Sequence, residues 1–155
     1  MKKLLVLGLF VFGLSYQQAD AQIRIGLNIN IGTQPVWGPV GYDHVDYYYM
    51  PDIDAYYYVP NRQFIYLEGN RWVFAASLPA RYRGYDLYHG YKVVINEPKP
   101  YLRAPYYRTH YVKYKNWKGP RQVVIRDSRD DRYIRARENE HHDKGRGHDN
   151  GRRGH

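Results

Sequence analysis

The chain has 155 residues, a formal net charge of +9 and no cysteine. The lack of cysteine excludes disulfides and Cys-based zinc ribbons, and we expect no lipid anchor of the lipoprotein type. The GxSxG, HExxH, P-loop and GxGxxG motifs of common enzyme classes are also missing, so we predict that the protein is not an enzyme.

The first 21 residues have the three parts of a secretory signal peptide. A positive start (MKK) precedes an apolar run over residues 4–14, and Ala19 and Ala21 are the small residues that a signal peptidase reads. The sequence therefore predicts cleavage before Gln22 and a periplasmic or secreted protein. No later apolar stretch approaches the roughly 20 residues of a membrane helix, so we expect no transmembrane span in the mature chain.

Three features precede the centre of the chain. Apolar residues alternate with polar or small ones over residues 23–31, which predicts a strand whose apolar face packs on the rest of the core. Residues 32–41 are rich in proline and glycine and are expected to form a loop anchored by Trp37. Residues 45–50 are predicted as a further strand or an edge segment.

The centre of the predicted fold is a three-stranded meander within residues 51–79. Gly69 and Asn70 predict a two-residue hairpin turn of type I′, because both residue types tolerate a positive φ. A two-residue loop at this point pairs Leu67 with Trp72 across the two strands.

The first turn of the meander decides which side chains share a face. We expect a three-residue loop, residues 60–62, which pairs Tyr57 with Ile65; a two-residue loop would reverse the faces. In this register the core face carries the following side chains: Ile53, Ala55, Tyr57, Val59, Ile65, Leu67, Trp72 and Phe74.

The opposite face of this register gathers four aromatic rings, with two arginines close by. In one interpretation the rings are half-buried under the next segment and keep their hydroxyls wet; in the other they form an exposed platform on which a sugar, a peptide or another flat group stacks. The candidate ligand-binding residues are Tyr56, Tyr58, Phe64 and Tyr66 for stacking, with Arg62 and Arg71 nearby.

Asp52 and Asp54 are a second candidate site. On a strand, their i,i+2 spacing would place both side chains on one face, about 7 Å apart. Carboxylates at that separation can run acid–base chemistry or hold a hard cation, so a hydrolase of envelope polymers is an alternative hypothesis.

The chain beyond residue 79 alternates between short elements. We expect a helical turn within residues 80–90, a strand over residues 91–96 and a proline-rich connector. A short helix is predicted over residues 106–117, started by Pro105, with His110 as a packed or surface histidine.

Residues 118–155 have the composition of a tail. They contain 11 Lys and Arg against seven Asp and Glu, with few apolar side chains, so we expect a basic, largely disordered segment. A last short strand at residues 122–125 and a marginal helix over residues 130–139 are predicted within it. Imidazoles suit Zn, Cu and Ni, so divalent-metal binding by the tail is a further alternative function, with these ligands: His141, His142, His148 and His155.

Residues 41–117 resemble a family of small, tyrosine-rich, exported bacterial proteins of unknown function. The resemblance rests on YYYMPDIDAYYYVPNRQFIYLEGNRWVFAASLPARY, with its PDID acid motif, Gly-Asn turn, tryptophan and Leu-Pro, and on PYYRTHYVKYK. It implies a periplasmic or secreted location and supplies no catalytic residues.

Seventeen of the 19 tyrosines lie between Tyr42 and Tyr114, which favours a thin, sheet-rich domain. We predict a mainly β (α+β) domain over residues 22–117, a small antiparallel sheet with one or two short helices, between a signal peptide (1–21) and the tail (118–155). The leading functional hypothesis is a non-enzymatic envelope protein without cofactor. Its tyrosines and Arg/Lys would bind an anionic polymer, a lipid surface or a glycan, or a protein partner. Because the protein is expected to be exported, we do not expect cytoplasmic nucleic acid as a partner.

Overall fold

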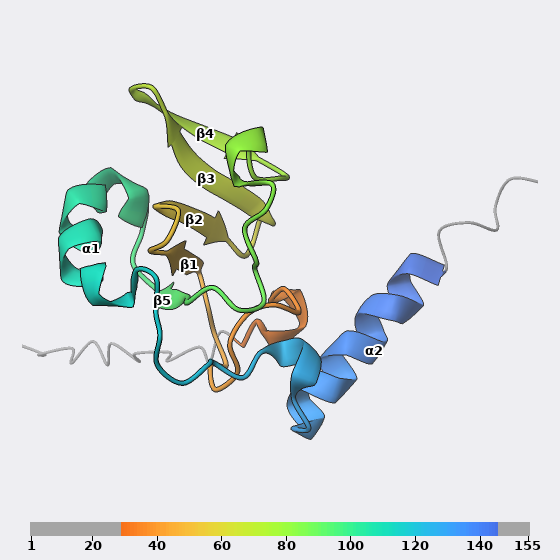
Figure 1. Cartoon of the computed structure of the whole chain (residues 1–155). Coiled ribbons are helices and arrows are strands. Elements are labelled where there is room, and N and C mark those ends of the chain that lie inside the picture. The colour runs from red at the N-terminus through yellow and green to blue at the C-terminus, as the bar shows by residue number, and fades with distance from the viewer. Residues whose placement is uncertain (1–28, 146–155) are drawn as a thin grey trace, which may run out of the picture.

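The computed structural model describes the backbone of residues 29–145 and the side chains of residues 29–138. Its centre is a five-stranded antiparallel sheet with the order β4-β3-β2-β1-β5 (Figure 1). The strands are β1 (Tyr47–Met50), β2 (Ala55–Tyr58), β3 (Gln63–Glu68), β4 (Arg71–Ala75) and β5 (Val93–Ile95). The predicted mainly β, α+β class is confirmed. The predicted signal peptide lies outside the described residues.

The helices are short, apart from the last one. They are η1 (Ile31–Thr33), η2 (Ala80–Tyr82), η3 (Pro100–Arg103), α1 (Ala104–His110), η4 (Val112–Tyr114), η5 (Ile125–Asp127) and α2 (Asp131–Gly145). The predicted turn in residues 80–90, strand in 91–96 and helix started by Pro105 are confirmed, although the helix begins at Ala104 and divides into α1 and η4. Within residues 29–145, no helix is long and apolar enough to cross a membrane.

The register predicted for β3 and β4 is confirmed. Leu67 pairs with Trp72, and Glu68 pairs with Arg71 across the turn. Only Gly69 of the two turn residues has a positive φ, 58°, so the turn is not the predicted type I′, which requires a positive φ at both residues. The pairing is unchanged because the loop length, rather than the turn type, fixes it.

The register predicted for β2 and β3 is wrong by one residue. Tyr57 pairs with Phe64 rather than with Ile65, because the loop has four residues, 59–62. Val59 leaves the ladder, and its amide donates a hydrogen bond to the Asp46 carbonyl oxygen (2.9 Å). A shift of one residue moves every side chain of β2 to the other face of the sheet.

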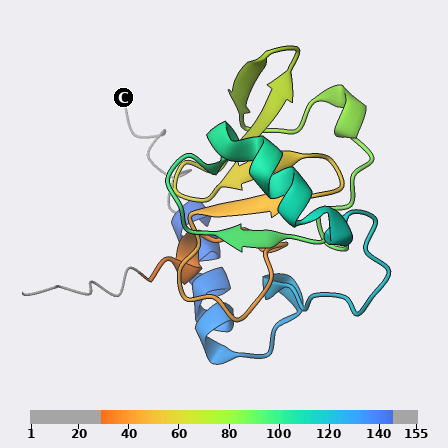
Figure 2. The same ribbon diagram turned by 90° about the vertical axis from the view of Figure 1, so that its left-hand side faces the viewer.

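Both faces of the sheet are covered. The first face carries Tyr48, Tyr57 and Phe64, which pack against Trp37 from the loop before β1 and against apolar side chains of residues 78–88. The second face lies under α1, which crosses β1 and β2 in Figure 2. It buries these side chains: Tyr47, Tyr49, Tyr56, Ile65, Ile95, Ala104 and Tyr107. Because β1 pairs with β2 on one side and with β5 on the other, it is an interior strand rather than an edge.

The fold continues beyond the predicted boundary at residue 117. Ile31, Ile125 and Tyr133 form a third buried cluster that joins η1, η5 and α2, and α2 extends away from the sheet (Figure 1). The Tyr133 hydroxyl accepts hydrogen bonds from the Gly41 and Tyr42 amides (2.8 and 3.1 Å). Val124, Ile125, Ser128 and Tyr133 are therefore packed against the fold although they lie in the predicted tail, and α2 is longer than the predicted marginal helix.

Two more predictions concern the ends of the described chain. Ile31 belongs to η1 rather than to the predicted strand over residues 23–31, most of which lies outside the described residues. The predicted strand at 122–125 is reduced to a single bridge between Pro39 and Val124. The disorder predicted from residue 140 onward falls on residues whose side chains are not described.

Candidate functional site

The aromatic platform predicted on one face of the meander does not form. Tyr56 and Tyr58 lie on the α1 face, whereas Phe64 and Tyr66 lie on the opposite face. Tyr56 is fully buried, and Phe64 and Tyr66 are each only 7% exposed. The shift of the β2–β3 register causes the separation. The interpretation in which these rings lie under neighbouring segments is closer to the structure.

The two arginines of that prediction are also apart. Arg62 ends the loop before β3 and Arg71 begins β4, so the whole length of β3 separates them. Both are exposed. Their positions offer no joint contact with one small ligand.

Asp52 and Asp54 lie in the turn before β2 rather than on a strand, and each holds a different segment. Asp54 accepts hydrogen bonds from the Tyr49 hydroxyl (3.1 Å) and from Nε of Arg108 on α1 (3.0 Å). Asp52 Oδ1 accepts a hydrogen bond from the Asn116 amide (2.6 Å). The two carboxylates thus tie residues 108–116 to the sheet.

The strongest concentration of charge lies in residues 99–121, here called the cationic segment. It contains seven Lys and Arg and no Asp or Glu: Lys99, Arg103, Arg108, Lys113, Lys115, Lys118 and Arg121. It includes η3, α1 and η4, on the side of the sheet that faces the viewer in Figure 2. Aromatic rings alternate with these charges, and Tyr106 and Trp117 are 49% and 39% exposed.

Some cations of this segment serve the fold. Arg108 pairs with Asp54, and Arg103 pairs with Glu97 (2.7 Å). Among the described residues, the other five cations form no ion pair and are exposed. Lys99 lies at the N-terminal end of the segment, and four lie at its C-terminal end: Lys113, Lys115, Lys118 and Arg121. The Lys113 ammonium lies 5.0 Å from the centroid of the Tyr114 ring, and no described carboxylate neutralises these four C-terminal charges, so they are available to an external anion.

Three rings form a fixed aromatic cluster beside these charges. Tyr91 stacks on Tyr114 with ring centroids 4.2 Å apart, and Trp117 contacts both rings at 5.5 and 5.4 Å. The Trp117 indole Nε1–H donates a hydrogen bond to the Pro120 carbonyl oxygen (2.9 Å). A Cβ on Gly119 would lie 2.2 Å from the indole, so only glycine leaves room for this ring.

A hollow of about 290 Å³ opens next to this cluster. We call it the Trp117 hollow, and it is lined chiefly by Asp52, Asp86, His89, Asn116, Trp117 and Lys118. Asp86 Oδ2 lies 2.5 Å from His89 Nδ1, and Asp86 Oδ1 accepts the Tyr88 amide hydrogen (2.9 Å). The His89 pairing lowers the pKa of Asp86 below its ordinary value, so this carboxyl is ionised at neutral pH.

Lys92 is buried close to this hollow. Its side chain is 1% exposed, and Gln122 fixes its backbone through hydrogen bonds to both N–H and C=O (2.9 Å each). Burial lowers the pKa of Lys92 to about 8, while the charges of Asp86 and Asp52 act in the opposite direction. Lys92 therefore lies within the electrostatic field of the two carboxylates that line the hollow.

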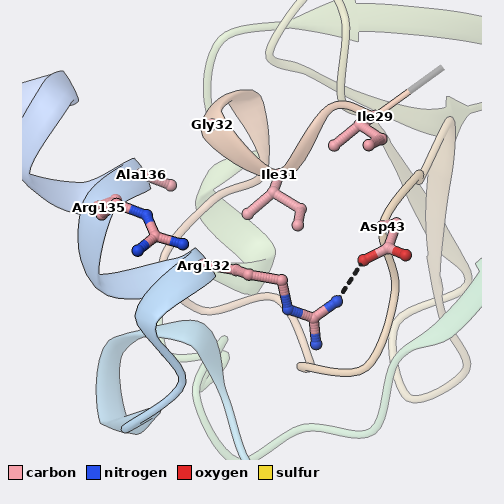
Figure 3. Close-up of a pocket in the computed structure, with 7 residues that line it drawn as sticks. All are labelled: Ile29, Ile31, Gly32, Asp43, Arg132, Arg135 and Ala136. Carbon is pink, nitrogen blue, oxygen red and sulfur yellow. Dashed lines mark hydrogen bonds and ion pairs between the residues drawn. The ribbon is translucent and has the colours of Figure 1, made fainter. Parts of the chain in front are cut away.

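A larger hollow of about 420 Å³ lies between η1 and α2 (Figure 3). Ile29 and Ile31 form its apolar part, and Arg132 and Arg135 reach toward it from α2. Arg132 is already paired with Asp43 (2.6 Å) and with Asp130 (2.8 Å). Because one of its two arginines is already neutralised in this way, the cationic segment is the stronger candidate site.

The metal ligands predicted in the tail lie outside the described side chains: His141, His142, His148 and His155. Within residues 29–138, no group of three or more His, Asp or Glu side chains is placed to hold a metal ion. Metal binding by the tail stays a prediction.

Comparison of the chain with protein-family models, with curated proteins and with solved structures found no match. The resemblance to tyrosine-rich exported proteins therefore stays a prediction. The cationic segment and the Trp117 hollow are the features of the described residues that point to a function. The signal that identifies the segment, an acid-free run of seven cations, is present in the sequence itself.

Proposed function

We propose that this protein is a non-enzymatic, exported envelope protein that binds an acidic polysaccharide through the cationic segment. The observation that carries the proposal is the run of seven cations without an acid, interleaved with exposed aromatic rings. The ligand class is the one predicted from the sequence, while the contact surface moves from the sheet to α1, η4 and the residues that follow. The signal-peptide pattern supports export.

The charge of the segment supplies attraction. Lys113, Lys115 and Lys118 follow one another along η4 and the next loop, unpaired among the described residues and exposed. A cluster of like charges raises the local concentration of a polyanion and speeds its association. Because these charges are in contact with solvent, salt should screen the attraction over a Debye length of about 10 Å at 0.1 M ionic strength.

The rings of the segment favour a polysaccharide over a simple anion. Tyr106 stacks with His110 at 5.4 Å on the outer side of α1, and Arg103 lies 4.9 Å from the centroid of the same tyrosine ring. A sugar ring has an apolar C–H face that packs on an aromatic ring and a rim of hydroxyls that needs polar partners. Alternating aromatic and cationic side chains suit a chain of acidic sugars.

The test compares two triple variants of the mature chain, residues 22–155, for binding to polygalacturonate. The first carries Lys113→Gln, Lys115→Gln and Lys118→Gln. The matched control carries Arg71→Gln, Arg83→Gln and Arg129→Gln, which removes three exposed charges outside the segment. We expect the first variant to bind at least about tenfold more weakly with a shallower salt dependence, and the control to change by less than about threefold.

Three results would overturn the proposal. Equal losses in the two triple variants would mean that binding follows net charge rather than this surface. A larger loss in the control, which contains Arg71, would return the contact to the meander. No binding by the unmutated chain would remove acidic polysaccharide as the ligand.

A further inference from the structure

The Trp117 hollow joins the C-terminal end of the cationic segment to a wall that is built in advance. Three contacts fix Trp117: the hydrogen bond to Pro120, the ring contacts with Tyr91 and Tyr114, and the close approach that Gly119 permits. A large aromatic ring that is 39% exposed and already held in place loses little conformational entropy when a ligand packs on it.

The rim of the hollow is suited to hydroxyl donors. Asp52 Oδ1 accepts one hydrogen bond from the Asn116 amide, and Oδ2 lies 3.4 Å from the Tyr85 hydroxyl. An ionised carboxylate has about four acceptor sites, so both Asp52 and Asp86 can accept further hydrogen bonds. The hydroxyls of a sugar ring can supply them, whereas a phosphate or sulfate group would be repelled by two carboxylates.

The lining of the hollow also offers a positive charge to one anionic group. Lys118 lines it and has no ion-pair partner among the described residues, and the free Nε2 side of His89 adds a polar group. Lys92, buried in the field of Asp52 and Asp86, offsets part of their charge. A ligand with several hydroxyls and a single carboxylate matches this distribution of charge.

The size of the hollow limits the ligand to about one ring. Small-molecule pockets hold roughly 300–1,000 Å³, and this hollow, at about 290 Å³, lies just below that range. We propose that the Trp117 hollow is the subsite for one uronic-acid ring, which packs on Trp117, directs its hydroxyls to Asp52 and Asp86 and directs its carboxylate to Lys118. This inference rests on the proposed function, and the neighbouring sugars of the polymer would extend toward Lys113 and Lys115.

The sharpest test is Gly119→Ala, which keeps every charge and every ring but places a Cβ 2.2 Å from the present position of the indole. The matched control is Gly32→Ala, because a Cβ there meets nothing within 4 Å. Binding of the mature chain to trigalacturonate and to linear polyphosphate of equal charge is measured by calorimetry. We expect Gly119→Ala to weaken trigalacturonate binding about tenfold, with polyphosphate binding changed less than about twofold.

A second variant, Trp117→Ala, keeps the test decisive if Gly119→Ala fails to fold. Trp117 lies at the surface, so its removal should leave the fold intact and give the same selective loss. Unchanged trigalacturonate binding in either folded variant would overturn the subsite. So would equal losses for trigalacturonate and polyphosphate, because the hollow would then act only through charge. In both cases the proposed function would stand if the Lys113, Lys115 and Lys118 triple variant still lost polygalacturonate binding.

Discussion

The buried sheet and the cationic segment use the same residue type in opposite ways. Tyr48, Tyr49 and Tyr56 are 0–1% exposed in β1 and β2, because these interior strands are covered on both faces. Tyr106, on the outer side of α1, is 49% exposed. In the sheet a tyrosine contributes its ring to the core and buries its hydroxyl with it, whereas in the segment the ring itself remains available to a ligand.

A high tyrosine content therefore does not identify a binding surface in this fold. The positions of the acidic residues do, because they determine which cations are neutralised and which remain available to a ligand. Asp54 and Glu97 pair with Arg108 and Arg103, which fastens the start of the segment to the fold. No acid follows Glu97 until after Arg121, so the later cations and the rings beside them face solvent together.

The largest effect should come from removing sheet tyrosines. Tyr56→Ala with Tyr58→Ala removes one fully buried ring and one partly buried ring, and we expect a loss of about 5 kcal/mol or more in the free energy of unfolding, enough to unfold a small domain. The exposed counterpart, Tyr106→Ala with His110→Ala, should cost less than about 1 kcal/mol. Urea unfolding measures both. A Tyr56/Tyr58 variant that folds with unchanged stability would show that the sheet tyrosines contribute no more to the core than the exposed tyrosines do.

Alkaline pH should destabilise the sheet through the same tyrosines. Burial raises the pKa of Tyr48, Tyr49 and Tyr56 well above the ordinary value of 10. The stability that their protonated forms provide is complete below pH 10, where the unfolded chain also keeps its protons. It is lost as pH rises above 10, at up to about 4 kcal/mol per pH unit for three tyrosines.

Circular dichroism and tyrosinate absorbance, followed together, check this expectation. The absorbance of the buried tyrosinates should appear at the pH at which the sheet signal is lost. Ionisation of all tyrosines with the secondary structure intact would show that the sheet rings are accessible to water.

The pairs that the sequence predicts correctly are those set by local turns. Gly69 and Asn70 fix the β3–β4 register because a two-residue loop leaves one pairing. The β2–β3 register depends on the Val59 amide, which donates to Asp46 thirteen residues earlier. No local pattern indicates that contact, and the error of one residue placed Tyr56 on the same face as Phe64 and Tyr66.

The candidate site also has one part that depends on neighbouring residues in the sequence and one part that depends on distant residues. The acid-free run of cations can be read from the sequence, because it is a property of consecutive residues. The Trp117 hollow depends on contacts between distant residues, such as Asp52 with the Asn116 amide, 64 positions apart. The packing of α2 is equally non-local, since it depends on a Tyr133 hydroxyl that reaches the Gly41 amide.

Lys92→Met tests whether the buried ammonium of Lys92 lowers the stability of the fold. The pKa of Lys92 in the folded protein is about 8, below the ordinary 10.5. Between these values the unfolded chain holds a proton that the folded protein has lost, so stability should rise with pH in this window, and below pH 8 the cost of burying the charge is constant. Methionine keeps the apolar stem and removes the charge, so we expect a gain of about 2–3 kcal/mol at pH 7.

Urea unfolding at pH 7 and at pH 9.5 measures the Lys92 effect. The difference between Lys92→Met and the unmutated chain should shrink at the higher pH. A variant that is less stable at both values would mean that the ammonium is stabilised by its surroundings, so that Asp52 and Asp86 outweigh the cost of burial.

The smallest effect concerns a single hydroxyl in the sheet. The Tyr56 hydroxyl is buried and has no hydrogen-bond partner among the described residues, whereas the neighbouring Tyr49 hydroxyl donates to Asp54. A buried polar group without a partner costs about 1–3 kcal/mol, and a formed hydrogen bond contributes about 1 kcal/mol. We therefore expect Tyr56→Phe to raise the free energy of unfolding by about 1 kcal/mol and Tyr49→Phe to lower it by a similar amount.

Thermal unfolding of the two Phe variants gives the comparison, since they remove the same atom from adjacent rings 4.9 Å apart. A loss of stability in Tyr56→Phe would show that its hydroxyl has a partner in solution, and the sheet would then depend on every hydroxyl it buries. A gain would mean that the sheet needs the Tyr56 ring but not its oxygen. The occurrence of tyrosine rather than phenylalanine at position 56 would then follow from the high tyrosine content that the sheet shares with the binding segment. It would not be required by the packing of the core.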